Sequence, residues 1–251
     1  MSHILTIDSG NTFIKWGLYD QCDLVFQGKV KQEETAILKQ AWQNIPEPSS
    51  IIVSNVAGDA AHENLIVLCS AWKMKPHWLT AVRQQCGVRN FYSRPGQLGS
   101  DRWAALVAAW NQELQASMVI NIGTAMTVDV LSDSGDFLGG LILPGPDLMF
   151  NVLKAHTAIP CVELGNFDQL PVCTADAIYS GVVQSLIGAI ERMNQVLCKH
   201  LGYSMQNYII SGGASPLILP HLSIQAKVVE NLVLEGLLLI ANDHLNSAML
   251  D

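Results

Sequence analysis

The sequence predicts an α/β protein built from two similar halves, and three observations support this prediction. Short apolar runs of strand length alternate with longer segments whose apolar residues recur at helical spacing. A strand–turn–strand pattern occurs twice, at residues 4–19 and 118–131. The chain of 251 residues suits two domains of roughly 100–150 residues each, and its apolar fraction of 49% is enough for two cores. We therefore expect an N-terminal domain at residues 1–115 and a C-terminal domain at residues 116–251.

The two hairpins open the two halves. Each has two apolar runs around a glycine-containing turn, which is typical of a β-hairpin. Moving the first hairpin along the chain by 113 residues superposes Asp8 on Asn121 and Gly10 on Gly123. This internal near-repeat suggests that each half begins with a hairpin whose turn approaches a shared ligand.

The remaining elements follow from local patterns. Strands are expected at apolar runs bounded by glycine or proline, at residues 50–55, 139–145 and 208–210. Helices are expected where apolar residues recur at helical spacing, at residues 33–44, 60–72, 100–115, 175–200 and 231–244. The helix at residues 100–115 has the clearest start, because Ser100 can cap it.

The charge balance excludes several classes of protein. With 14 Lys and Arg residues against 22 Asp and Glu residues, the formal net charge is −8 at pH 7. The low charged fraction of 14% and the high apolar content exclude a disordered chain. An acidic balance without a cluster of Lys and Arg argues against nucleic acid or an anionic membrane as the partner. Small-molecule substrates stay compatible, including anionic ones, since local groups can oppose the global sign.

The sequence also indicates a soluble protein of a bacterial-type cytoplasm. The N-terminus lacks the pattern of a targeting signal, and no segment has the roughly 18 apolar residues of a membrane span. The six cysteines are scattered, without a Cys-x-x-Cys pair. Reduced thiols are therefore expected rather than disulfides.

The first hairpin carries a candidate phosphate site, Asp8-x-Gly10-Asn11-Thr12-x-x-Lys15. Gly10 lets the backbone approach a ligand closely, and the N–H groups of the turn can point at phosphate oxygens. At a strand end, Asp8 can hold Mg²⁺ directly or through water, while Lys15 adds a positive charge. The spacing differs from that of a P-loop, and an ordinary hairpin turn would also account for the motif taken alone. The recurrence of the pattern in the second half favours a phosphate site.

Two further motifs are weaker when each is taken alone. Gly99-Ser100-Asp101-Arg102 puts a carboxylate and a guanidinium at a helix N-terminus, where the helix dipole and the free N–H groups favour anions. An ordinary helix start has the same residues. The turn Ser211-Gly212-Gly213-Ala214 is open enough to admit a flat ring such as adenine, although a plain tight turn would look alike.

Motifs in one consistent order span nearly the whole chain. They are Asp8-Ser-Gly-Asn-Thr-Phe-Ile-Lys15, Asn90-Phe-Tyr92, Gly99-Ser-Asp-Arg-Trp-Ala-Ala105, Gly123-Thr-Ala-Met-Thr-Val-Asp129, Gly139-Gly-Leu-Ile-Leu-Pro-Gly145, Thr157-Ala-Ile-Pro160, Thr174-Ala-Asp-Ala-Ile-Tyr-Ser-Gly181 and Ile210-Ser-Gly-Gly213. Together they resemble the acetate-and-sugar-kinase, actin and heat-shock chaperone superfamily. In detail they resemble type III pantothenate kinase, also called the Bvg accessory factor family. The resemblance implies two duplicated ribonuclease-H-like (actin-like ATPase) domains with a central interdomain cleft.

The resemblance also implies a reaction and roles for residues. ATP would phosphorylate the primary hydroxyl of pantothenate, the first step of coenzyme A biosynthesis, with Asp101 as the general base and Asp8 at Mg²⁺. The residues that would bind ATP are Asp8, Ser9, Gly10, Asn11, Thr12, Lys15, Thr124, Gly212 and Gly213. The residues that would bind pantothenate are Tyr92, Gly99, Ser100, Asp101, Arg102 and Thr174, with Arg102 on its carboxylate. The family is homodimeric, with part of the pantothenate pocket supplied across the interface, and the helix at residues 175–200 is the expected interface element.

One position departs from the family pattern. The second phosphate motif of the family begins with an Asp that is associated with a monovalent cation such as K⁺ or NH₄⁺, whereas this sequence has Asn121 there. An amide oxygen can still ligate a hard cation, but one negative charge is missing beside the phosphates. Asp129 lies across the hairpin turn and is not a simple substitute. Three hypotheses follow: a weak or absent K⁺ dependence, a compensating ligand, or a catalytically weakened relative.

Two alternatives to a pantothenate kinase stay open on the sequence. The same fold could phosphorylate another small hydroxy acid, or the chain could be a catalytically weakened, nucleotide-binding regulatory protein. Asn121 is the best support for a regulatory protein. The intact Asp101 and Arg102 favour retained activity.

Overall fold

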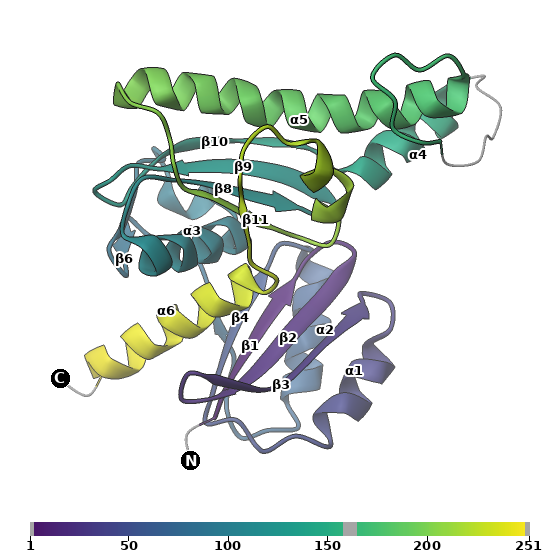
Figure 1. The fold of residues 1–251 in the computed structure, drawn as a ribbon. Helices are drawn as coiled ribbons and strands as arrows, with labels where there is room; N and C mark the ends of the chain where they lie inside the picture. The colour runs from purple at the N-terminus through teal and green to yellow at the C-terminus, as the bar shows by residue number, and fades with distance from the viewer. Residues whose placement is uncertain (1–2, 158–164, 249–251) are drawn as a thin grey trace. The chain divides into compact units, whose positions relative to one another are not determined.

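The computed structural model describes residues 3–157 and 165–248, which form two compact units (Figure 1). The first unit contains the chain up to Leu114, the short segment Gly135–Phe137 and the chain from Asn231 onward. The second unit contains Gln115–Ser134 and Leu138–Glu230. Each unit combines a sheet with helices, as expected for an α/β chain.

The first unit is built on a five-stranded sheet in the order β3-β2-β1-β4-β5. Its strands are β1 (His3–Ser9), β2 (Phe13–Asp20), β3 (Asp23–Lys31), β4 (Ser50–Asn55) and β5 (His77–Trp78). The first three strands pair antiparallel, whereas β4 runs parallel to β1 and β5 runs parallel to β4. The expected first hairpin and the strand at residues 50–55 are therefore confirmed.

Helices cover both faces of this sheet. On one face, α1 (Thr35–Trp42) and α2 (Asp59–Cys69) bury Leu38, Trp42 and Leu65 against apolar residues of β1, β2 and β4. On the other face lie α3 (Ser100–Glu113) and α6 (Leu232–Ala248), which contact β4, with α6 also reaching β1. Burying apolar side chains on both faces is the main source of stability for such a layered unit.

The first unit also contains a short hairpin, β6 (Gln84–Gln85) and β7 (Val88–Asn90). The first residues of β10 (Asp136–Pro144) pair in parallel with β7, with Phe137 opposite Asn90. A 3-10 turn, η1 (Pro95–Gln97), then leads to α3.

The second unit has the same strand order as the first, β12-β11-β8-β9-β10. Its strands are β8 (Ser117–Ile122), β9 (Ala125–Leu131), β10, β11 (Tyr208–Ser211) and β12 (Lys227–Val228). In both units the first strand of the hairpin lies between its antiparallel partner and a parallel strand from later in the chain. The duplication expected from the repeated hairpin is thus visible in the topology.

The helices of the second unit are α4 (Pro146–His156) and α5 (Thr174–Leu201), and two 3-10 turns, η2 (Ser215–Leu217) and η3 (Leu219–His221), follow β11. The long helix α5 runs along one face of the strands β8 and β9 (Figure 1). On this face α5 buries Val183, Leu186 and Ile190. The side chains on that face come from alternate strand residues such as Ile120 and Val128. Asn121 and Asp129 therefore belong to the opposite face.

The compact units differ from the expected domains at α6 and at Gly135–Phe137, which both belong to the first unit although they follow the expected boundary. The first division falls between Leu114 and Gln115, one residue from the expected boundary, whereas α6 belongs to the first unit although it comes last in the sequence. The physical reason is close packing between α3 and α6. Gly236 lies so near Ala104 that a Cβ added there would overlap the Ala104 carbonyl oxygen.

Several elements differ from the sequence predictions. The sequence did not predict β3, α4 and β12. The strand β3 lies at the edge of its sheet and exposes Leu24, Val25 and Phe26, so it lacks the alternation of a half-buried strand. At the start of α3 the capping position is occupied by Gly99 rather than Ser100, which is the first helical residue.

Two further expectations concern particular segments. Of the motif at residues 157–160, only Thr157 belongs to the described part of the chain. Cys161 likewise lies outside it. Among the helices of the described residues, none combines the length and the apolar character that a membrane crossing requires.

Candidate active site

The first hairpin places Asp8 and Lys15 directly opposite each other in adjacent strands. The turn between them is closed by a hydrogen bond of 3.0 Å from the Gly10 N–H to the Phe13 carbonyl oxygen. Asn11 and Thr12 are exposed at its tip. Directly opposed residues in antiparallel strands have neighbouring side chains, so the carboxylate and the ammonium of this pair lie on one face of the sheet.

A second strand brings the start of α3 close to Asp8. In the parallel pair of β1 and β4, Asp8 is in register with Ser54. The Ser54 hydroxyl is buried and lies 2.9 Å from the Ser100 hydroxyl, in the first turn of α3. This serine pair couples the strand beside Asp8 to the helix that carries Asp101. Ser54 was missed on the sequence, where its only signal is its position at the end of a buried strand.

The Asp8 carboxyl group is unusual in its surroundings. Its Oδ1 atom is buried and has no hydrogen-bond partner among the described residues. Burial raises the pKa of Asp8 to about 7, the nearby Asp101 raises it further, and the Lys15 charge opposes the shift. A carboxylate whose buried oxygen has no hydrogen-bond partner can be stabilised by binding a cation.

Asp101 lies in the first turn of α3, and its carboxylate contacts the backbone of that turn. Its Oδ1 accepts a hydrogen bond of 2.8 Å from the Arg102 N–H. Burial raises the Asp101 pKa, while this hydrogen bond and the Arg102 charge act in the opposite direction. A Cβ at Gly99 would come within 2.6 Å of the same oxygen, so a side chain there would displace the Asp101 carboxylate from this position.

Arg102 and Tyr92 are brought together, as expected for two residues of one substrate site. The Arg102 side chain is buried, and its Nη1 donates a hydrogen bond of 3.3 Å to the Tyr92 hydroxyl. The guanidinium also lies 5.8 Å from the centre of the Phe137 ring, within cation–π range. Tyr92 is held by its own N–H, which donates to the Asn90 side chain at 3.0 Å. The arrangement fixes a planar cation that can bind a carboxylate through two hydrogen bonds.

The donor set of the first unit fits Mg²⁺ that is shared with a nucleotide. The described residues contain no group of three or more His, Cys, Asp or Glu side chains that could hold a metal by themselves. Mg²⁺ commonly binds through one or two carboxylates together with substrate phosphates and water. The unused Oδ1 of Asp8 supplies one such ligand.

In the second unit, backbone contacts hold the second turn in place. The Gly145 N–H donates a hydrogen bond of 2.9 Å to the Thr124 carbonyl oxygen, and Gly145 lies directly against Gly123. Gly212 adopts a positive φ of 99° and packs on Ile122, where a side chain would overlap the backbone. The Gly212-Gly213 turn and the Gly123-Thr124 turn are therefore neighbours, as the sequence motifs suggested.

Asn121 lies within the second unit on the polar side of the hairpin. It pairs with Thr127 across the strands, and Asp129 pairs with Val119. Asn121 and Asp129 are thus diagonal neighbours on one face of the sheet. They lie closer together than their positions on the two sides of the hairpin turn suggested. Asp129 is buried and has interactions of its own.

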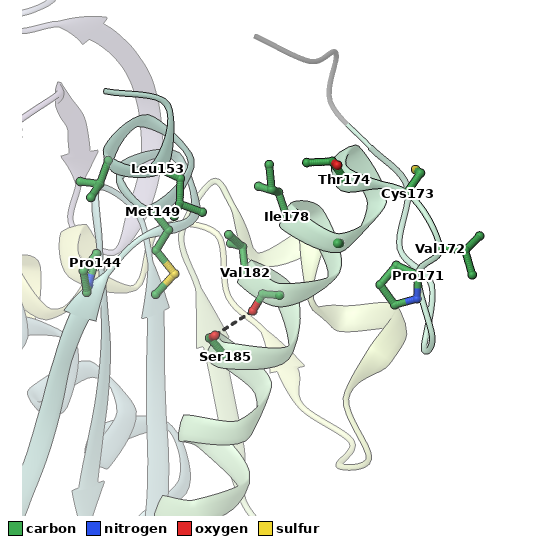
Figure 2. A pocket seen from close by; sticks show the side chains of 13 residues that line it. Pro144, Met149, Leu153, Pro171, Val172, Cys173, Thr174, Ile178, Val182 and Ser185 are labelled. Carbon is green, nitrogen blue, oxygen red and sulfur yellow. Dashed lines mark hydrogen bonds between the residues drawn. The ribbon is translucent and has the colours of Figure 1, made fainter. Parts of the chain in front are cut away.

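Thr174 lies in a different part of the second unit, at the first residue of α5. It lines a pocket of about 940 Å³ between α4, α5 and residues 171–173 (Figure 2). The lining is mainly apolar, with Met149, Ile178 and Val182 among its side chains. Pro144, the residue before Gly145, lines the same pocket, so one end of the pocket adjoins the segment that holds the second turn.

Comparison with known proteins shows what the chain is similar to. Residues 4–196 match the family described as type III pantothenate kinase. A protein of Nitrosospira multiformis named Type III pantothenate kinase is 50% identical over 240 residues, covering 96% of this chain and 91% of that protein.

Two solved structures share the fold at low sequence identity. The activator of the 2-hydroxyisocaproyl-CoA dehydratase from Clostridium difficile, with bound ADPNP, has a TM-score of 0.57 at 13% identity, covering 98% of this chain and 97% of that one. MreB 5 of Spiroplasma citri, bound to AMPPNP, has a TM-score of 0.53 at 10% identity, covering 99% and 98%. Together with the repeated strand order, these likenesses confirm the predicted fold class of duplicated ribonuclease-H-like, actin-like ATPase units.

Proposed function

The chain belongs to the type III pantothenate kinase family, and we propose how its residues carry out the family's reaction. It transfers a phosphoryl group from ATP to the primary hydroxyl of pantothenate, which yields 4′-phosphopantothenate and begins coenzyme A biosynthesis. The prediction of a kinase is thereby confirmed. A kinase for another hydroxy acid and a regulatory protein are not favoured.

The observation that carries the residue assignment is the proximity of two partly buried carboxyl groups in the first unit. Asp8 has an unused buried oxygen, and Asp101 is close enough to raise its pKa. Phosphoryl transfer depends on alignment and on neutralisation of charge more than on covalent participation of the protein. A cation-binding carboxylate beside a proton-accepting carboxylate meets both needs.

In this proposal Asp8 is the ligand of Mg²⁺, and Asp101 is the general base. Bound Mg²⁺ neutralises charge on the ATP phosphates. Asp101 accepts the proton of the pantothenate hydroxyl as the hydroxyl oxygen bonds to the terminal phosphorus of ATP. The bond between this phosphorus and the bridging oxygen breaks, and ADP leaves. Burial makes the Asp101 carboxylate a better proton acceptor, since its pKa is raised. The backbone N–H of Arg102 donates a hydrogen bond to one oxygen of the Asp101 carboxylate and so orients this oxygen.

ATP is bound by backbone and side-chain groups of the two turns. We assign the phosphates to Ser9, Gly10, Asn11, Thr12 and Lys15 in the first unit and to Thr124 in the second. We assign the adenosine portion to Gly212 and Gly213, in the turn that packs on the backbone of the second hairpin at Ile122. The positive φ of Gly212, which glycine adopts readily, sets the course of this turn beside the second hairpin.

Pantothenate is assigned to Tyr92, Gly99, Ser100, Asp101, Arg102 and Thr174. Its carboxylate binds the Arg102 guanidinium, which Tyr92 and Phe137 hold in place. A bidentate pair between a guanidinium and a carboxylate is among the stronger polar contacts in proteins. Thr174 contributes a hydroxyl to the mainly apolar pocket between α4 and α5.

At the proposed site for a monovalent cation, this chain departs from the family pattern. Asn121 replaces a charged ligand by an amide oxygen, which weakens a K⁺ or NH₄⁺ site without removing every ligand. We therefore propose an enzyme that keeps its activity and responds weakly to exchange of K⁺ for Na⁺. The neighbouring Asp129 already has contacts and does not replace the missing charge.

A homodimer is also part of the proposal. The pocket between α4 and α5 is large, apolar and open, and its residues Val152 and Val172 are exposed. Exposed apolar surface of this kind is commonly covered by another protein chain. A second copy that packs on α5 would cover it beside Thr174.

We propose that the enzyme works in the cytoplasm on small molecules, without a nucleic acid or membrane partner. Its net charge of −8 disfavours extended polyanions such as DNA. ATP and pantothenate are small anions that a few local positive groups can attract.

The experiment that tests the residue assignment is the Asp101→Asn substitution. The variant keeps the size of the side chain and loses the proton acceptor, so pantothenate-dependent ATP consumption should fall by roughly 100-fold or more. Asp133→Asn is the matched control, since Asp133 is an exposed aspartate elsewhere on the chain. Near-normal turnover in Asp101→Asn would remove this residue as the base, and wild-type protein inert toward pantothenate would contradict the function itself.

A further inference from the structure

Gln32, which follows β3, reaches back to the turn of the first hairpin. Its side-chain Nε2 donates hydrogen bonds to the Ser9 hydroxyl at 2.8 Å and to the Gly10 carbonyl oxygen at 2.7 Å. Its backbone N–H donates to the Thr12 carbonyl oxygen at 3.0 Å. One residue, at least twenty positions away in sequence, thus contacts three residues of the turn.

These contacts determine the direction of a backbone donor. In a trans peptide unit the C=O of one residue and the N–H of the next point in opposite directions. Because the Gly10 carbonyl points at Gln32, the Asn11 N–H of the same peptide unit points away from Gln32. Asn11 is exposed, so the tip of the turn that carries this N–H is accessible to a ligand.

We infer that Gln32 is a positioning residue for the nucleotide phosphates. It does not touch the nucleotide. It holds the carbonyl groups of the turn on one side, so that N–H groups rather than carbonyl oxygens face the phosphates. A turn free to rotate its peptide units would present carbonyl oxygens part of the time, and these repel an anion.

The second turn shows how the same requirement is met without a side chain. There the Thr124 carbonyl accepts from the Gly145 N–H at 2.9 Å, and Gly145 packs against Gly123. The backbone N–H of Gly145 therefore holds a carbonyl group of the second turn, as the Gln32 side chain holds a carbonyl group of the first turn. Only the first turn can be released by changing one side chain, which makes Gln32 the position to test.

This inference rests on the proposed function, because it assumes that the first turn binds the phosphates of ATP. The test compares Gln32→Ala, Gln32→Glu and the control Gln40→Ala, an exposed glutamine on α1. Steady-state kinetics give KM for ATP and for pantothenate separately. Calorimetry gives the affinity for a non-hydrolysable ATP analogue with Mg²⁺, without any acceptor.

Loss of the two side-chain hydrogen bonds should raise KM for ATP and the Kd of the analogue roughly tenfold in Gln32→Ala. KM for pantothenate should change less than about twofold, since that site lies on other residues. Gln32→Glu keeps the shape but cannot donate, and it adds a negative charge beside the turn. We expect it to weaken ATP binding roughly tenfold more than Gln32→Ala.

The possible results separate the inference from the function. Folded Gln32→Ala and Gln32→Glu with unchanged affinity for the ATP analogue would overturn the positioning role while leaving the kinase intact. Equal increases of both KM values, together with a lower Tm, would also overturn it, because they indicate general loss of structure. A wild-type protein that binds the analogue but does not phosphorylate pantothenate would contradict the proposed function alone. If Gln32→Ala does not fold, the nearly isosteric Gln32→Glu decides.

Discussion

Replacing Asp8 by Asn should stabilise the protein in the absence of ligands. Burial raises the pKa of Asp8 from its ordinary value of 3.8 to about 7. Between these two values the folded state holds a proton that the unfolded state has released, so the free energy of unfolding falls as the pH rises from about 4 to about 7. Above pH 7 the folded protein carries a buried negative charge, and the neutral amide of asparagine removes it.

The size of the effect follows from the pKa shift. A shift of about 3 units corresponds to about 4 kcal/mol, at about 1.4 kcal/mol per unit. The Asn variant should therefore gain up to about 4 kcal/mol at pH 8 but only about 1 kcal/mol at pH 4.5, where Asp8 is largely protonated in the fold. For a chain of this length the gain at pH 8 corresponds to an increase of Tm on the order of 10 °C.

Thermal unfolding in EDTA at both pH values measures this difference. Asp23→Asn is the matched control, because Asp23 is exposed at the start of β3 and its substitution should leave Tm nearly unchanged. Added Mg²⁺ and ATP should then stabilise wild type more than the Asn variant, since ligand binding stabilises the state that binds it. Equal Tm values for wild type and Asp8→Asn at pH 8 would refute the reasoning, as would the same Tm difference at both pH values.

Two further predictions test the packing of α6 and the second hairpin. Gly236→Ala should lower the free energy of unfolding by about 3 kcal/mol, because its methyl group overlaps the Ala104 carbonyl of α3, whereas Gly188→Ala in α5 meets open space and should be neutral or slightly stabilising. Urea unfolding compares the two, and similar losses would show that the α3–α6 contact is not tight. Asn121→Asp should increase the ratio of activity in K⁺ to activity in Na⁺ at constant ionic strength, because it restores a charged cation ligand. A wild-type enzyme that already requires K⁺ strongly would contradict the role given to Asn121.

The fold was predictable from the sequence to a large extent, because its strongest signals are local. Both hairpins and the helices α3 and α5 follow from periodic apolar residues and glycine turns. The repeat that superposes Asp8 on Asn121 predicted the duplicated topology, which the two sheets display. The edge strand β3 escaped prediction, because an exposed edge does not impose an alternating pattern on its residues.

The candidate site also contains some residues that the sequence predicts and some that it does not. Motif residues such as Asp8, Asp101 and Arg102 could be selected from the sequence, because turn and helix-start chemistry is encoded in short segments. Ser54 and Gln32 could not be selected, since each acts through a contact with a distant segment. No local pattern distinguishes such a serine or glutamine from one on an ordinary surface.

The sequence by itself determined the α/β class, the duplication and the family, and it predicted the chemical groups of the candidate site. These properties depend on residue identity and on spacing within short segments, which the chain carries in any conformation. Only the tertiary structure decided that α6 belongs with the first unit, that Asp8 keeps a buried oxygen without a partner, and that Gln32 holds the first turn. These properties depend on which distant groups share one environment, and burial and hydrogen-bond partners are defined only after the chain has folded.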